Sequence, residues 1–100
     1  MSYLTQLADH YSTLHSADVP AAVRLKARFV LADFLSVYIA GLARGPLSEI
    51  LLQYAGTKTG EPAATVPFTD RRTDAETAAL VCAAIAHSVE LDDGHRYGTA

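Results

Sequence analysis

The stretch that decides the fold is Thr73-Asp-Ala-Glu-Thr-Ala-Ala-Leu-Val-Cys-Ala-Ala-Ile-Ala-His-Ser-Val89. Its apolar residues recur at helical spacing, as at Val81 and Ile85. Thr73 and Glu76 have the spacing of a capping box, which predicts a helix over about 74–89. Alanine fills much of the remaining surface, and small side chains let neighbouring helices approach closely. The stretch therefore predicts a core helix that is packed on several sides.

Two more helices are expected near the N-terminus. Ser2 can cap a first helix over residues 3–14. Asp18 can cap a second helix over 21–42, with Pro20 in its first turn and Gly41 and Gly45 closing it. After Val30 this helix is apolar nearly all round, which predicts a central and buried position.

A shorter helix and a short β element are expected between the second helix and the core helix. The helix runs from Leu47 to Tyr54 or Ala55 and ends at Gly56. Segment 64–68 has β-branched and aromatic residues, but Pro67 limits it to a short edge strand. Residues 69–72 then form a turn. The sequence as a whole predicts an all-α fold with a short β element near residues 64–72.

Composition excludes several classes of protein. The chain has 100 residues, 50% of them apolar, which suits one folded domain. A formal net charge of −3 argues against nucleic acid as a partner. There is no signal-peptide pattern, and the longest apolar stretch is interrupted by Asp33 and too short for a bilayer, so no membrane association is expected. A single cysteine, Cys82, suits a reducing compartment, and a cytoplasmic location is predicted.

The predicted core helix runs into an unusual acidic cluster. Glu90, Asp92 and Asp93 follow it directly, and His95 and Arg96 come next. Because a helix C-terminus carries partial negative charge, carboxylates there cost stability unless a cation, a ligand or chemistry compensates. A local rule that is broken at one place indicates a functional site.

The residues alone leave three interpretations of this cluster open. Carboxylates and imidazole are ordinary metal ligands, but their spacing here matches no zinc or calcium motif, so no metal is expected. Acid–base catalysis is the second interpretation, because imidazole titrates near neutral pH and closely spaced carboxylates favour protonation of one another. The third is a solvated helix end whose acids pair with Arg96 or Arg72.

Three other polar residues lie in apolar surroundings. His87 lies three residues before Glu90 on the same predicted helix face, and it is either a core histidine or part of the same cleft. Cys82 is expected to be a small buried hydrophobe. Asp33 is either a satisfied buried carboxylate or an interface residue.

The segment Ala86-His-Ser-Val-Glu-Leu-Asp-Asp-Gly-His95 resembles a motif of the MmgE/PrpD family, A-H-A-x-D-F-D-D-T-H. Two upstream regions are similar to the same family in the same order. They are the helix from Pro20 to Gly41 and the strand Ala64-Thr-Val66 with the alanine-rich helix after it. The family includes 2-methylcitrate dehydratase, cis-aconitate decarboxylase and iminodisuccinate epimerase. The chain thus resembles the N-terminal part of the family's helical domain.

The resemblance implies roles for the acidic cluster. Glu90 stands where the family usually has Asp, and Gly94 stands where it has Thr; both positions are implicated in the family's active site. Asp92 and Asp93 match the family's paired Asp, which organise the loop as well as the site. The implied catalytic residues are Glu90, Asp92 and Asp93, and the implied substrate-binding residues are His87, Gly94, His95, Arg96 and Thr99.

The resemblance also implies an activity. The family transfers a proton at a carbon next to a carboxylate and dehydrates, decarboxylates or epimerises a small di- or tricarboxylic acid, with no cofactor. Residues 1–100 would form an N-terminal segment, inactive by itself, with the rest of the helical domain and an α+β lid domain absent from it. A homodimer is expected, because so short a chain leaves apolar faces uncovered. The alternative hypothesis is a helical interaction or oligomerisation module without chemistry.

Overall fold

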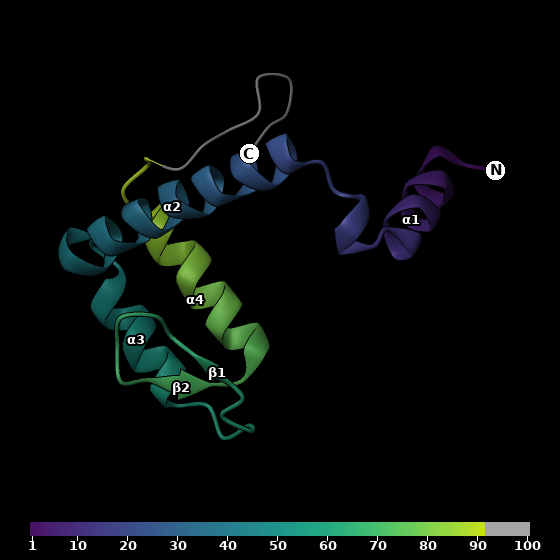
Figure 1. The fold of residues 1–100 in the computed structure, drawn as a ribbon. Helices are drawn as coiled ribbons and strands as arrows, with labels where there is room; N and C mark the ends of the chain where they lie inside the picture. Colours follow the sequence, from purple (N-terminus) through teal and green to yellow (C-terminus); the bar gives the residue numbers. More distant parts are fainter. Residues whose placement is uncertain (92–100) are drawn as a thin grey trace. The chain divides into compact units, whose positions relative to one another are not determined.

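The structure, a computed structural model, describes residues 1–91. The chain divides into two compact units, Met1–Leu31 and Ala32–Ala100, and helix α2 crosses the boundary between them. Figure 1 traces the elements along the chain. In order they are α1 (Tyr3–Thr13), a 3₁₀ turn η1 (Ser16–Asp18), α2 (Ala21–Arg44), α3 (Ser48–Gly56), β1 (Ala64–Thr65), β2 (Arg72–Thr73) and α4 (Ala75–His87).

The predicted N-cap of α1 is observed in the structure, whereas the predicted N-cap of α2 is not. The Ser2 hydroxyl accepts the Thr5 backbone N–H at 3.1 Å, which confirms the predicted cap of α1. The prediction that Asp18 caps α2 is wrong. Its carboxylate accepts the His15 N–H at 3.2 Å and so closes η1, and α2 begins directly after Pro20.

Helix α2 is longer than predicted and buried on fewer sides. The helix continues two residues beyond the predicted Leu42, to Arg44, so Gly41 does not close it, whereas Gly45 follows the helix directly and its N–H donates to the Gly41 carbonyl at 2.7 Å. Only Val37, Tyr38 and Gly41 are buried in it, and Asp33 is exposed, not buried. Among residues 1–91, no helix combines the length and apolar character that a bilayer crossing requires.

The β element is a two-stranded antiparallel sheet in which Ala64 pairs with Thr73 and Thr65 pairs with Arg72. The predicted strand at 64–68 is shorter than expected, because the chain turns at Pro67. The predicted turn at 69–72 ends one residue early, since Arg72 already belongs to β2. The expectation of a mostly helical fold with a short β element is confirmed.

Helix α4 is capped by Asp74, one residue later than the predicted capping box. The Asp74 carboxylate accepts the Thr77 N–H at 2.9 Å and the Thr77 hydroxyl at 2.7 Å. These hydrogen bonds stabilise the charged form of Asp74 and lower its pKa, and the bond from the Thr77 hydroxyl has the largest effect. Thr73 does not cap the helix, and its hydroxyl instead donates to the Asp74 carboxylate at 3.4 Å.

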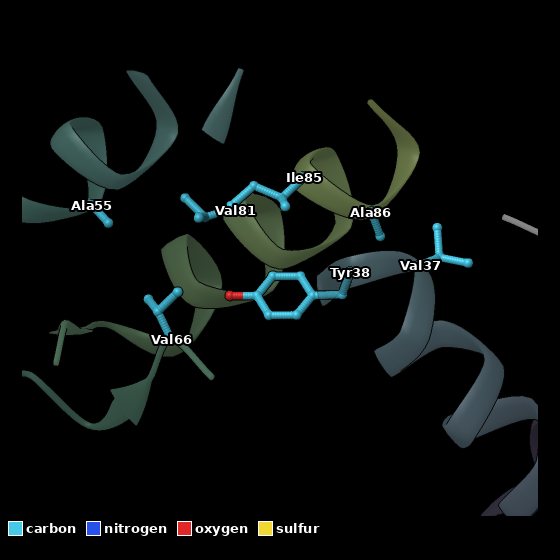
Figure 2. Packing of buried hydrophobic residues seen from close by; sticks show 7 residues of the cluster. All are labelled: Val37, Tyr38, Ala55, Val66, Val81, Ile85 and Ala86. Carbon is cyan, nitrogen blue, oxygen red and sulfur yellow. The ribbon is translucent and has the colours of Figure 1, made fainter. Parts of the chain in front are cut away.

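The core of the C-terminal unit gathers side chains from α2, α3, α4 and the loop after β1 around Tyr38 (Figure 2). The Tyr38 ring reaches from α2 towards Val66, and its hydroxyl donates to the Pro67 carbonyl at 2.8 Å. Cys82 packs against this cluster as a half-buried side chain, and burial raises the pKa of its thiol. The cluster consists of Val37, Tyr38, Ala55, Val66, Val81, Ile85 and Ala86.

Candidate functional site

The candidate site begins at the C-terminal end of α4. Of the residues predicted for it, His87 and Glu90 lie in the described part of the chain. The other predicted residues lie outside the described residues: Asp92, Asp93, Gly94, His95, Arg96 and Thr99.

The last turns of α4 are anchored in the core. Val81 and Ile85 are fully buried, Ala86 is 2% exposed, and Val89 packs against the same cluster. Figure 2 shows Ile85 and Ala86 on this part of α4 beside Tyr38 and Val37 of α2. Burial of these side chains stabilises the helix end, so the residues that follow Val89 leave the core from a fixed point.

Gly41 brings α2 and α4 unusually close together. A Cβ atom at this position would collide with the backbone carbonyl of Ile85 and would lie 3.0 Å from the Ile85 Cγ2. Only glycine therefore fits here, and the reason is the approach of α4, since its φ is not positive. The contact fixes the depth of α4 against α2 one turn before the acidic segment begins.

Ser88 closes the end of α4. Its backbone N–H donates to the Ala84 carbonyl at 3.0 Å, and its hydroxyl donates to the Ile85 carbonyl at 2.6 Å. A Cβ at Gly45 would lie 2.6 Å from the Ser88 hydroxyl oxygen. Ser88 thus satisfies helix-end carbonyls while packed against the chain that leaves α2.

His87 and Glu90 both have exposed side chains. The Glu90 N–H donates to the His87 carbonyl at 3.0 Å, which joins the two residues in one turn beyond the helix. His87 is therefore not the core histidine that one interpretation of the sequence predicted. The alternative, that it lines a cleft with Glu90, stays a prediction.

Glu90 has a left-handed backbone, with φ of 54°. This conformation is normally adopted by glycine, asparagine or aspartate. For a residue with a longer side chain it is about 1–2 kcal/mol less favourable than a right-handed backbone. Strained positions of this kind persist where the surroundings fix them, and they cluster at functional sites. The same residue also places a carboxylate at the negative end of a helix. Two independent departures from local preference thus coincide at Glu90.

The described part of the site offers one carboxylate for chemistry, that of Glu90. Glu90 offers an exposed carboxylate that can accept or return a proton. Within residues 1–91 no group of three His, Cys, Asp or Glu side chains is placed to hold a metal ion.

Sequence reasoning missed three residues that position this segment. Gly41 and Gly45 were interpreted as helix terminators, and Ser88 had no assigned role. The available signal was the alanine-rich composition of α4, because small residues on one helix indicate close approach by another. A glycine inside an otherwise apolar helix is the complementary half of that signal.

A family model described as the MmgE/PrpD N-terminal domain matches residues 5–100. No curated protein and no solved structure matches the chain. The matched range covers nearly all of the described elements and every residue predicted for the site.

Proposed function

Because the chain belongs to the MmgE/PrpD family by its N-terminal domain, we propose that it forms the N-terminal part of an enzyme. The proposed reaction is proton transfer at the carbon next to a carboxylate of a small di- or tricarboxylic acid. The observation that carries the proposal is Glu90, an exposed carboxylate on a strained backbone at the end of a helix anchored in the core.

A cytoplasmic location is part of the proposal. It is supported by Cys82, the single cysteine of the sequence, because proteins of reducing compartments rarely carry disulfides.

Glu90 is proposed as the group that takes the proton. When it removes the proton from carbon, the electron pair of the C–H bond stays on that carbon and delocalises into the adjacent carboxylate. If the neighbouring C–O bond breaks, the pair forms a C=C bond and hydroxide leaves with a proton as water. If the proton returns on the opposite face, the product is the epimer. In a decarboxylation the C–C bond breaks instead, carbon dioxide leaves, and the acid form of Glu90 protonates the carbon.

The remaining predicted residues complete the proposal. Asp92 and Asp93 are proposed to organise the loop after Glu90 and to share in catalysis. Substrate carboxylates need cations, which Arg96 and His95 are proposed to supply, because a guanidinium binds carboxylates through two parallel hydrogen bonds. The other proposed substrate-binding residues are His87, Gly94 and Thr99. No cofactor is required by this chemistry.

The test uses the complete protein that contains residues 1–100 and a panel of small di- and tricarboxylates, with 2-methylcitrate, cis-aconitate and iminodisuccinate included. We expect turnover of at least one acid, and we expect Glu90→Gln to lower kcat by 10²-fold or more at an unchanged fold, because an amide cannot take the proton. Glu61→Gln is the matched control, since Glu61 is an exposed loop carboxylate.

Two outcomes would contradict the proposal. Near-normal activity of Glu90→Gln removes Glu90 from the mechanism, and enzyme-like turnover by residues 1–100 alone contradicts the expectation that this segment is inactive by itself. Exchange of the substrate C–H with deuterium from solvent supplies a second readout, because proton transfer at carbon predicts it and simple binding does not.

An exposed apolar stripe on α3 and its N-cap residue favours the alternative function of an interaction module. Leu47, Ile50 and Tyr54 lie at helical spacing and are 45%, 63% and 40% exposed. Apolar stripes of this kind mark contact surfaces, and a homodimer is the proposed partner state. Ile50→Lys should lower the association measured by analytical ultracentrifugation. If it does so in a complete protein that shows neither turnover nor solvent exchange, the module replaces the enzyme as the better proposal.

A further inference from the structure

The turn that joins β1 to β2 has a backbone conformation that its sequence does not favour. The Thr69 N–H donates to the Val66 carbonyl at 3.2 Å, with Pro67 and Phe68 in the two central positions. Phe68 has φ of 61°. Proline followed by a positive φ is a type II turn, in which the second central position normally holds Gly or Asn. A bulky aromatic residue there is an outlier that persists only where contacts fix it, and within the turn the Thr69 hydroxyl donates to the Val66 carbonyl at 2.8 Å.

The Tyr38 hydroxyl makes the contact that can hold this turn. It donates to the Pro67 carbonyl at 2.8 Å, and the Tyr38 side chain is fully buried. The peptide between the two central residues of a type II turn is rotated by about 180° relative to the same peptide in a type I turn. Rotation to type I would therefore swing the Pro67 carbonyl away, and the buried hydroxyl would exchange this acceptor for the Cys82 thiol, a weaker partner.

The same turn sets the position of an exposed aromatic ring. Phe68 is 65% exposed, and its ring centroid lies 6.3 Å from that of Tyr38. Phe34, at the surface of α2, stacks on Tyr38 with centroids 6.4 Å apart. In the type II form the buried Tyr38 ring is thus flanked by two partly exposed phenylalanines.

We propose that residues 66–69 form a two-state turn, in which the Tyr38 hydroxyl selects the type II form and so presents the Phe68 ring beside Tyr38 and Phe34. Without that hydrogen bond, the Pro67–Phe68 peptide rotates to the type I form and Phe68 takes a negative φ. The hydroxyl therefore acts as a latch between α2 and the surface of the hairpin.

The test compares glycine with alanine at position 68, with Tyr38 intact and replaced. At a positive φ glycine is favoured over alanine, whereas at a negative φ alanine is favoured because it restricts the unfolded chain. With Tyr38 intact we expect Phe68→Gly to melt roughly 3–6 °C above Phe68→Ala. In the Tyr38→Phe background we expect the order to reverse. An unchanged order in both backgrounds would overturn the proposal.

A direct NMR measurement of φ at Phe68 in the complete protein is a second test of the proposal, and its result for the unsubstituted protein does not depend on whether Tyr38→Phe folds. With ¹³C,¹⁵N-labelled phenylalanine, the Phe68 resonance is identified by its loss in Phe68→Gly. The distance between its amide and α protons, measured from the nuclear Overhauser effect between them, reports the sign of φ, because these two protons lie closer together at a positive φ than at a negative one. We expect a positive φ in the unsubstituted protein and a negative φ in Tyr38→Phe, and a negative φ in the unsubstituted protein would refute the latch.

Discussion

At the scale of single residues, Glu90 is the position where stability and the proposed function oppose each other. A carboxylate on a left-handed backbone at a helix C-terminus is unfavourable for two reasons, one steric and one electrostatic. Natural proteins retain such residues where activity needs them, and replacement then raises stability while it lowers activity.

We therefore expect Glu90→Gly to stabilise the protein by about 1 kcal/mol, because glycine adopts a positive φ without steric cost. The free energy of unfolding from denaturant titration measures the effect. Glu90→Gln is the matched control, since it keeps the long side chain on the left-handed backbone and removes only the charge. A loss of stability in Glu90→Gly would show that the Glu90 side chain makes contacts that outweigh the strain.

At the scale of elements, the packing of α2 against α4 depends on a glycine. The Ile85 carbonyl occupies the space where a Cβ of residue 41 would lie, so a larger residue forces the two helices apart. Well-packed helices resist such a shift, because every neighbouring contact has to change with it.

Gly41→Ala should therefore lower the free energy of unfolding by about 1–3 kcal/mol, although alanine is the better helix former. Gly60→Ala is the matched control, because the nearest atom to a Cβ there, the Asp74 Cβ at 3.5 Å, is at ordinary contact distance and the φ of Gly60 is not positive. We expect its unfolding free energy to stay within about 0.5 kcal/mol of the parent protein. Equal effects of the two substitutions in chemical denaturation would contradict the close approach.

The sequence predicted the elements well where local pattern determines them. The cap at Ser2 and the helical spacing of apolar residues in α4 are local signals, and both correspond to observed structure. Gly41 was misinterpreted because its role depends on Ile85, a residue far along the chain. The left-handed backbone of Glu90 likewise has no local signal, since residue type alone favours a negative φ there.

At the scale of the whole molecule, Tyr38 links the stability of the core to alkaline pH. Burial, with smaller contributions from Cys82, raises the pKa of Tyr38 to about 12 from 10.0. The unfolded chain releases this proton at a lower pH than the folded protein does. The stabilisation is thus fully present below pH 10 and is lost as the pH rises towards 12.

We expect the melting temperature to fall between about pH 10 and 12, and we expect this fall to be smaller in Tyr38→Phe, which has no proton to lose at that position. Differential scanning calorimetry across this range measures both. Tyr3→Phe is the matched control, because Tyr3 is 74% exposed. An identical alkaline profile for the parent protein and Tyr38→Phe would contradict the buried state of the hydroxyl.

The core contact of Tyr38 has a consequence for synthesis on the ribosome. The residues that cover Tyr38 come much later in the chain, with Val66 in the hairpin and Ile85 in α4. Translation proceeds at about 5–20 residues per second, so α2 waits roughly 2–10 s before its partners have been made. Val37 and Tyr38 therefore emerge from the ribosome before the residues that cover them, and in that interval they are available to chaperones and to neighbouring nascent chains. Slow codons between residues 45 and 85 would lengthen this exposure and lower the yield of folded protein.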